Sequence, residues 1–245
     1  MSAPRLVGVG VGPGDPELVT VKGVRALREA DVVLVPVMGE DATGRAERVV
    51  LAHVDADRVE RAVFALDDRT GASVRRLEAW EGAAQRVAAA YARGARTVAF
   101  ATLGDPAVYS TFSYLAQTVR RHVPGVEVST VPGITALQDL AARSGTVLVE
   151  GTESLALLPL TAGVDALRAA LAGADTVVAY KGGRHLPDVL AALRDAGRLD
   201  DAVFGAALGT EEEDVRPAAD LGPGEAPYLS TVISVPRRGP TGGRL

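Results

Sequence analysis

The sequence predicts an α/β protein of two domains, in which a mainly parallel N-terminal sheet is followed by a mixed C-terminal sheet. A length of 245 residues is enough for one large domain or two modest ones. In the first half, β-branched apolar runs alternate with helical stretches, which is typical of a parallel sheet covered on both faces. In the second half, the run "YLSTVIS" (228–234) alternates small polar with apolar residues, as an antiparallel strand with one wetter face does.

The first half predicts four buried strands. They lie at 5–11, 31–37, 97–104 and 126–133. After the first strand, Leu18, Val21, Val24 and Leu27 recur at three- and four-residue spacing, which predicts one apolar face of a helix. A longer helix is expected over 74–94, where Gly94 is a suitable C-cap residue.

The second half predicts four more strands and two helices. The strands lie at 154–161, 176–183, 202–209 and 227–236, and the helices at 164–174 and 185–197. The acidic run "TEEEDV" (210–215) is expected to be a solvated loop face. We therefore place an N-terminal domain at 1–130 and a C-terminal domain at 131–236. The segment 237–245 is rich in Gly, Pro and Arg and is expected to be a disordered tail.

Composition excludes several classes of function. The net charge of −5 disfavours a nucleic-acid partner, which needs a basic surface. The chain has no cysteine, which excludes disulfides and thiolate catalysis, and its three histidines have no helical ligand spacing, so no protein-bound metal is expected. No signal peptide is visible, and the longest apolar runs are far shorter than the ~20 residues of a membrane span. A cytoplasmic protein without a membrane contact is expected.

The stretch "PRLVGVGVGPGDPELVT" (4–20) resembles a dinucleotide-binding turn but fails its test. The fingerprint G-x-G-x-x-G requires a third glycine where this chain has Pro13 or Asp15, and its acidic residue should follow the second strand, whereas Asp31 precedes it. No Gly-Lys-Ser/Thr of a phosphate-binding loop follows either. Two interpretations remain, a tight connection in which Asp15 caps a helical turn with Pro16 in its first position, or a loop for a ligand without phosphate.

Two further segments repeat the design of a strand, a glycine loop and a helix. They are "LGDPAVYSTFSYL" (103–115) and "VPGITALQDLA" (131–141). Ligands of open α/β sheets bind outside the carboxyl ends of the strands. Backbone amides, carboxylates and hydroxyls without clustered Lys or Arg suit an adenosine and a charged amino-acid end. The alternatives are that Asp105 only caps a helix before Pro106 and that Tyr109 is a core aromatic.

These three motifs, in this order and at these separations, resemble the tetrapyrrole (precorrin) methylase family over about residues 5–236. The segments "DPAVYSTFSYL", "VPGITALQDLAARSG" and "LLPLT" resemble its precorrin-2 C(20)-methyltransferase branch. Uroporphyrinogen and C-11 precorrin methyltransferases usually carry a second glycine where this chain has Leu103.

The resemblance implies a tetrapyrrole-methylase-like fold of two α/β domains with the active site in the cleft between them. It implies a homodimer that binds S-adenosylmethionine and methylates C-20 of precorrin-2, giving precorrin-3A in cobalamin biosynthesis. Another precorrin, cobalt-precorrin or uroporphyrinogen methyltransferase is the alternative. A non-enzymatic binding protein of the same fold is a third possibility.

The resemblance also implies a set of cofactor-binding residues. By motif matching they are Pro13, Leu103, Gly104, Asp105, Val108, Thr135, Ala136, Tyr180, Lys181 and Leu208. Lys181 departs from the apolar residue often found at its position. No general base is identified, and the candidates near the chemistry are Asp15, Tyr109, Ser110 and Thr111. The carboxylates of a tetrapyrrole need cations, for which Lys22, Arg45 and Lys181 are candidates, whereas His185 is expected at a helix start.

Overall fold

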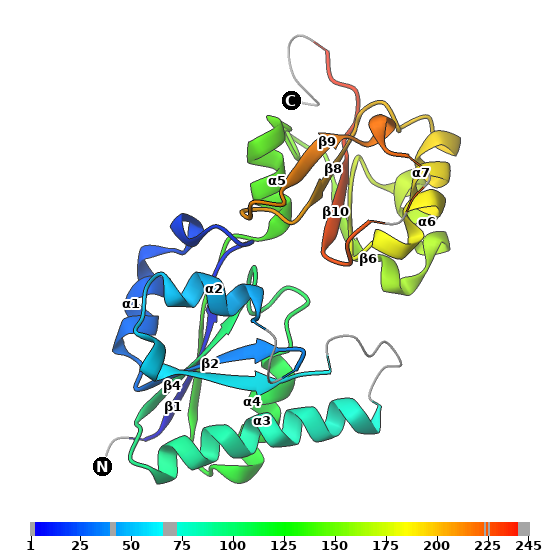
Figure 1. Cartoon of the computed structure of the whole chain (residues 1–245). Coiled ribbons are helices and arrows are strands. Elements are labelled where there is room, and N and C mark those ends of the chain that lie inside the picture. Colours follow the sequence, from blue (N-terminus) through cyan, green and yellow to red (C-terminus); the bar gives the residue numbers. More distant parts are fainter. Residues whose placement is uncertain (1–2, 40–42, 66–72, 223, 225, 240–245) are drawn as a thin grey trace. The chain divides into compact units, whose positions relative to one another are not determined.

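The structure, a computed structural model, describes residues 3–39, 43–65, 73–222, 224 and 226–239. The chain divides into two compact units, Met1–Thr135 (unit 1) and Ala136–Leu245 (unit 2), and each has its own sheet (Figure 1). The predicted domain boundary, between residues 130 and 131, lies a few residues before this division.

Unit 1 is built on a parallel five-stranded sheet of order β3-β2-β4-β1-β5. Its strands are β1 (Arg5–Gly10), β2 (Val32–Val37), β3 (Val59–Val63), β4 (Thr97–Thr102) and β5 (Glu127–Val131). Every pairing in it is parallel, which confirms the predicted sheet. Strand β3 was not predicted, because its charged residues interrupt the apolar strand pattern. As an edge strand β3 tolerates them, and Glu60 and Arg61 form ion pairs at its surface with Arg93 and Glu47.

Helices cover both faces of this sheet. They are α1 (Val21–Glu29), α2 (Arg45–Leu51), α3 (Val74–Ala92) and α4 (Phe112–His122), with short 3₁₀ turns at Pro16–Leu18 and Ala56–Arg58. One apolar cluster joins the sheet to α1 and α2, and a second joins it to α3 and α4 (Figure 1).

The start of α1 differs from the prediction. Leu18 belongs to a separate 3₁₀ turn, and α1 begins at Val21 because the Thr20 hydroxyl caps it by accepting a hydrogen bond from Gly23 N at 3.0 Å. Val21 was predicted on the buried face but is 86% exposed, whereas Leu27 is buried as predicted.

Asp31 has a structural role at the amino ends of the strands. Its Oδ2 accepts hydrogen bonds from the backbone N–H of Arg96 at 2.8 Å and of Thr97 at 2.9 Å. Both bonds lower the pKa of the Asp31 carboxyl, and the bond from Thr97 has the larger effect. Asp31 therefore joins the start of β2 to the start of β4, and it lies at the opposite edge of the sheet from the glycine loops.

Unit 2 contains a mixed sheet, as predicted, with five strands where four were predicted, in the order β6-β7-β10-β8-β9. Its strands are β6 (Leu155–Pro159), β7 (Thr176–Tyr180), β8 (Ala202–Ala206), β9 (Asp214–Pro217) and β10 (Ser230–Ser234). Only β6 and β7 pair in parallel. The acidic segment 210–215 was predicted to be a loop throughout, which is wrong for its end, because Asp214 and Val215 pair with β8 as part of β9.

Helices flank the central strands of unit 2 as well. They are α5 (Ala136–Ser144), α6 (Val164–Gly173) and α7 (Leu186–Asp195), with 3₁₀ turns at Leu160–Ala162, Gly183–His185 and Ala218–Asp220. The predicted wetter face of the last strand is wrong, because every residue of β10 is buried. Helix α5 packs on one side of the sheet and helices α6 and α7 pack on the other (Figure 1).

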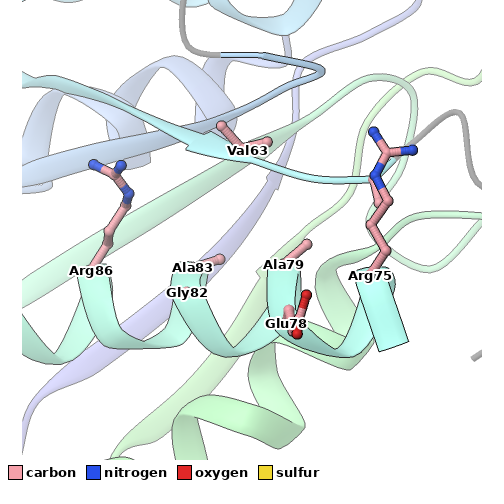
Figure 2. Close-up of a pocket in the computed structure, with 8 residues that line it drawn as sticks. Val63, Arg75, Glu78, Ala79, Gly82, Ala83 and Arg86 are labelled. Carbon is pink, nitrogen blue, oxygen red and sulfur yellow. The ribbon is translucent and has the colours of Figure 1, made fainter. Parts of the chain in front are cut away.

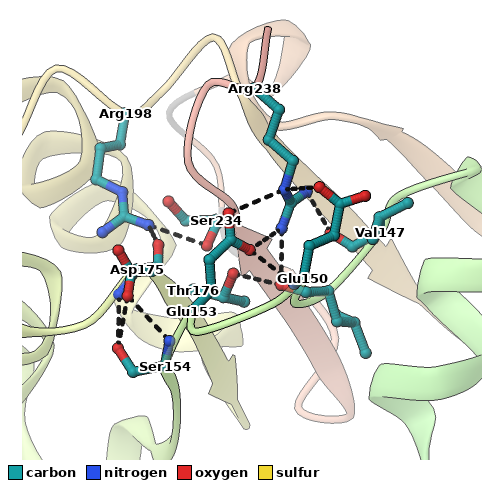
Figure 3. A network of polar contacts seen from close by, with 10 residues as sticks. Val147, Glu150, Glu153, Ser154, Asp175, Thr176, Arg198, Ser234 and Arg238 are labelled. Carbon is teal, nitrogen blue, oxygen red and sulfur yellow. Dashed lines mark hydrogen bonds and ion pairs between the residues drawn. The ribbon is translucent and has the colours of Figure 1, made fainter. Parts of the chain in front are cut away.

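Two arginines link the C-terminal segment of unit 2 to the rest of that unit (Figure 3). Arg238, in the predicted tail, donates a hydrogen bond from Nη2 to Glu153 Oε2 at 2.6 Å and forms an ion pair with Glu150 at 3.3 Å. The bond from Arg238 lowers the pKa of Glu153. Arg198 donates to the carbonyl of Ser234 at 3.2 Å. Residues 240–245 of the predicted tail lie outside the described residues.

Candidate functional site

Three loops of unit 1 leave neighbouring strands at the same edge of the sheet. Strand β1 pairs with β4 on one side and β5 on the other, and the three strands end in register. Beyond the strands, Val11 N donates to Thr102 O at 2.9 Å and Gly104 N donates to Gly12 O at 2.7 Å. The first and second glycine loops are therefore hydrogen-bonded to each other.

Three glycines bring the loop backbones into direct contact. A Cβ on Gly10 would lie 2.5 Å from Gly104 O and 2.6 Å from Gly133 N, and a Cβ on Gly133 would lie 2.7 Å from Gly10 Cα. No side chain fits at either position. Glycine is required at both positions by this close approach, and neither Gly10 nor Gly133 was predicted as a site residue.

Gly104 faces open space instead. Its φ of 66° lies in the left-handed region, and a Cβ placed on it would approach only Thr135 Cα, at 3.9 Å. Thr135 is buried, and Leu103 packs against the core cluster of α1 and α2. The backbone at Gly104 thus borders a space that a ligand atom can occupy, with Thr135 as its neighbour.

Asp105 holds the second and third loops together. Its Oδ1 accepts a hydrogen bond from Ala107 N at 2.7 Å, and its Oδ2 accepts one from Gly133 N at 3.0 Å. The first bond is the helix-cap interaction that the sequence suggested. The second spans 28 residues and fixes the position of the third loop. Asp105 is therefore a positioning residue as well as a cap.

The first loop has the cap predicted for it. Asp15 Oδ1 accepts a hydrogen bond from Glu17 N at 2.9 Å, with Pro16 in the first position of the 3₁₀ turn. Pro13 is buried between Gly12 and Gly14. The Asp15 carboxylate thus accepts a backbone hydrogen bond within this turn, which favours a structural role over that of a base.

Three of the predicted residues that follow Asp105 lie just before helix α4. The Ser110 hydroxyl lies 2.9 Å from Thr102 Oγ1 and accepts a hydrogen bond from Phe112 N at 3.1 Å, so it orders the start of α4. Thr111 is the N-cap residue of α4, without a side-chain cap hydrogen bond. Val108 is half-buried, and its N–H donates to Asp105 O at 3.2 Å.

Tyr109 is not a core aromatic. It is 43% exposed, with a φ of 49°. Partial burial raises the pKa of its phenol, so the group is protonated at neutral pH. Tyr109 can donate a hydrogen bond there but is a poor proton acceptor.

Three of the four predicted site residues of unit 2 lie at or just after the ends of its strands β7 and β8, and the fourth begins helix α5. The Tyr180 hydroxyl, at the end of β7, accepts a hydrogen bond from Leu137 N in the first turn of α5, at 2.9 Å. Ala136 begins that helix. Lys181 has a φ of 62°, and its N–H donates to Ser230 O at 3.0 Å. Leu208 is buried after the end of β8.

The other candidate residues are placed as follows. Lys22 is exposed on α1, and Arg45 is the first residue of α2. His185 is the N-cap residue of α7, at the helix start where it was expected. The glycine-loop segments 11–15, 103–111 and 132–135 themselves contain no Lys or Arg. The loops therefore suit a ligand without phosphate groups.

A cavity of about 300 Å³ lies elsewhere in unit 1 (Figure 2). It lies between the end of β3 and α3, where Arg75 and Arg86 extend on either side of Ala79 and Ala83. None of the predicted site residues lines it.

Within the described residues, no group of three or more His, Asp or Glu side chains is placed to hold a metal ion. No helix in that part of the chain is both long and apolar enough to cross a membrane.

Comparison with known proteins supports the family that the glycine-loop motifs predict. The profile of the tetrapyrrole (corrin/porphyrin) methylases matches residues 5–221. The chain is 36% identical to a precorrin-2 C(20)-methyltransferase from Sinorhizobium sp., over 94% of each protein, and 28% identical to a cobalt-precorrin-2 C(20)-methyltransferase from Salmonella typhimurium, over 82% of each.

A solved structure with S-adenosylhomocysteine bound has the same fold. The uroporphyrin-III C-methyltransferase of Thermus thermophilus, complexed with S-adenosylhomocysteine, is 26% identical with a TM-score of 0.63, and the match covers 94% of this chain and 97% of that one. The predicted resemblance and fold class are thereby confirmed. This chain belongs to the tetrapyrrole (corrin/porphyrin) methylase family.

Proposed function

We propose that the protein is an S-adenosylmethionine-dependent methyltransferase that methylates C-20 of precorrin-2, giving precorrin-3A in cobalamin biosynthesis. The observation that carries the proposal is the 36% identity to a precorrin-2 C(20)-methyltransferase over 94% of both proteins. The glycine loops support it, because all three are present and are held together by close backbone contacts.

The open space at Gly104 is the proposed seat of the cofactor. The backbone there would contact the ligand directly, with Leu103, Asp105, Val108 and Thr135 around it and Pro13 from the first loop. A positively charged sulfonium fits loops that contain carboxylates and no Lys or Arg. The contacts predicted from unit 2 belong to the same proposal and rest on the resemblance. They are Ala136, Tyr180, Lys181 and Leu208.

S-adenosylmethionine supplies an electrophilic methyl group whose leaving group is a neutral thioether. No general acid is therefore required of the protein, which agrees with the absence of a catalytic triad from the described glycine loops. The chain's contribution is to hold nucleophile and methyl group in line, and positioning of this kind is worth up to roughly 7–11 kcal/mol. The candidates for a base that removes the proton from C-20 after transfer are Asp15, Tyr109, Ser110 and Thr111, of which Asp15 and Ser110 already accept backbone hydrogen bonds.

Two parts of the proposal rest on the sequence alone. Homodimer assembly follows from the resemblance, and a cytoplasmic location follows from the composition. Precorrin-2 is named as the substrate because the relative named for the metal-free form is 36% identical over 94% of this chain, whereas the relatives named for the cobalt form are 35% identical over 63% of it and 28% identical over 82% of it.

Calorimetric titration tests the cofactor part of the proposal. S-adenosylhomocysteine is expected to bind in the micromolar range and NAD to give no heat of binding. Binding of NAD alone would restore the dinucleotide interpretation of the first loop. If neither ligand bound, the proposed methyl transfer would be contradicted while the family and the fold would stand.

A further inference from the structure

One lysine of unit 2 has a backbone conformation that its side chain disfavours. Lys181 follows the end of β7 with a φ of 62°, in the left-handed region that glycine adopts at less cost. Within the described residues, only Tyr109 and Ala207 share this feature among residues other than glycine. Strained positions of this kind persist where the surrounding structure fixes them, and they gather at functional sites. The strain at Lys181, directly before two glycines, points to a role for its side chain.

The segment that precedes β10 holds the backbone of this turn in place. Lys181 N donates a hydrogen bond to Ser230 O at 3.0 Å, and Ala226 N donates one to Gly183 O at 2.9 Å. A Cβ on Gly183 would overlap the carbonyl oxygen of Ala226 and would lie 2.5 Å from that of Pro227. The turn after β7 therefore packs backbone against backbone on this segment, which fixes the direction in which the Lys181 side chain leaves the turn.

An aromatic ring of the same segment faces the Lys181 ammonium. Nζ lies 5.9 Å from the centroid of the Tyr228 ring, within the range of a cation–π contact. Both side chains are half-buried. The face of a ring attracts an ammonium group without acting as a conventional hydrogen-bond acceptor, so it orients the group and does not itself use the three N–H donors of lysine. The contact thus orients a positive charge that an anionic ligand group can bind.

The turn carries a second positive charge and no acidic residue. Its sequence, "KGGRH" (181–185), includes Arg184, which is exposed and lies just before α7. The glycine-loop segments of unit 1, by contrast, contain no Lys or Arg. A tetrapyrrole with carboxylate side chains needs cations, which the glycine loops do not provide and this turn does.

We propose that Tyr228 and Arg184 complete, with Lys181, a binding site for a carboxylate side chain of the tetrapyrrole substrate. The Lys181 ammonium is its main contact, Tyr228 is a positioning residue that orients this ammonium, and Arg184 adds to the positive charge. The inference rests on the proposed function, because it names the groups with which that enzyme recognises its substrate. The cofactor contact proposed for Lys181 can be made by its backbone, whereas its ammonium is assigned here to the substrate.

The test compares the dissociation constants of precorrin-2 and of S-adenosylhomocysteine for the full chain and for single variants. Precorrin-2 is titrated with S-adenosylhomocysteine present, so that binding is measured without methyl transfer. Lys181→Met keeps the length of the side chain and removes its charge, and it should weaken precorrin-2 binding roughly tenfold to a hundredfold, as for a lost hydrogen bond to a charged group. Lys181→Arg should retain most of the affinity. Arg194→Met, the control, removes an exposed charge at the other end of α7 and should change neither constant.

A second set of variants separates positioning from a purely structural role. Tyr228→Leu removes the ring and should weaken precorrin-2 binding about twofold to fivefold, whereas Tyr228→Phe keeps the ring and should bind as the unmodified chain does. Lys181→Gly removes the ammonium and the strained φ together, so it should weaken precorrin-2 binding without lowering the midpoint of urea unfolding. A lysine with only a structural role would lower that midpoint and leave precorrin-2 binding unchanged.

A spectroscopic readout uses the scarcity of lysine. Lys22 and Lys181 are the only lysines of the sequence. Reductive methylation with ¹³C-labelled formaldehyde therefore gives two lysine signals in an NMR spectrum beside that of the α-amino group, and the Lys181 signal is identified by its absence from Lys181→Met. This signal should shift when precorrin-2 is added and should not shift with S-adenosylhomocysteine alone.

The outcomes distinguish this inference from the proposed function. Unchanged precorrin-2 binding in folded Lys181→Met would overturn the inference, while methyl transfer by the unmodified chain would leave the proposed function standing. Weaker binding of S-adenosylhomocysteine to that variant, or a Lys181 signal that this ligand shifts by itself, would also overturn it, by assigning the ammonium to the carboxylate of the cofactor. Weakened precorrin-2 binding in Lys181→Met, from a parent chain that transfers no methyl group, would support the inference and contradict the proposed function.

Discussion

Replacement of Gly133 by alanine should disrupt the candidate cofactor site by steric overlap alone. The added Cβ would lie 2.7 Å from Gly10 Cα and would overlap the carbonyl oxygen of Gly104. Carbon atoms in contact prefer about 3.5–4.0 Å, so the three loops must separate by roughly 1 Å. Both neighbours are backbone atoms, which have no rotamer to relieve the overlap.

The magnitude follows from the cost of overpacking, which is about 1–3 kcal/mol in free energy of unfolding. The same displacement strains the hydrogen bond from Gly133 N to Asp105 Oδ2. Movement of the loop wall by about 1 Å should also weaken binding of S-adenosylhomocysteine, by tenfold or more, because site contacts depend on positions held to about 0.5 Å.

Gly82→Ala is the matched control. Gly82 lies inside α3, and a Cβ there meets nothing within 4 Å. The same substitution should therefore stabilise the protein, by about 0.5–1 kcal/mol, and leave ligand affinity unchanged. Urea unfolding and calorimetry measure both quantities. A Gly133→Ala variant as stable as the unmodified chain and with unchanged affinity would refute the close-packing argument.

Three further predictions address single hydrogen-bonding groups. Asp105→Ala should lower the free energy of unfolding by about 1–3 kcal/mol and weaken S-adenosylhomocysteine binding, while Asp105→Asn, which keeps one acceptor oxygen, should lose less of both in the same titrations. Tyr180→Phe should cost about 1 kcal/mol in urea unfolding, because Leu137 N loses its acceptor, and an unchanged midpoint would contradict that bond. The lowered pKa of Asp31 stabilises the fold above its ordinary value of 3.8, and this stability is lost as the pH falls below 3.8 through the lower folded value. Asp31→Asn should therefore be less stable at neutral pH and show a smaller further loss on acidification over that range.

The sequence predicted the strands whose residues are buried on both faces. Strands β1, β2, β4 and β7 are β-branched runs between glycines or charged residues, and they were located to within a few residues. Strands β3 and β9 were missed because charged side chains interrupt their apolar pattern, which the edge strands β5 and β6 retain. Val21 was misplaced because the Thr20 cap, rather than apolar spacing, sets where α1 begins.

The glycine loops were predicted as ligand-binding loops, but the contacts that hold them together were not. The cap made by Asp105 follows from its place before Pro106, whereas its bond to Gly133 joins segments 28 residues apart and depends on the parallel register of β1 with β4 and β5. The same limit applies to Tyr180, whose hydroxyl meets Leu137 across 43 residues. A local pattern contains no information about such distant pairs.

The most direct test of the central claim is the position of the transferred methyl group. The protein would be incubated with precorrin-2 and S-adenosylmethionine that carries a ¹³C-labelled methyl group, with cobalt-precorrin-2 and uroporphyrinogen III in parallel, and the products examined by mass spectrometry and ¹³C NMR. We expect one added methyl group on precorrin-2, with its label at C-20. A label at another carbon, or methylation of uroporphyrinogen III alone, would contradict it.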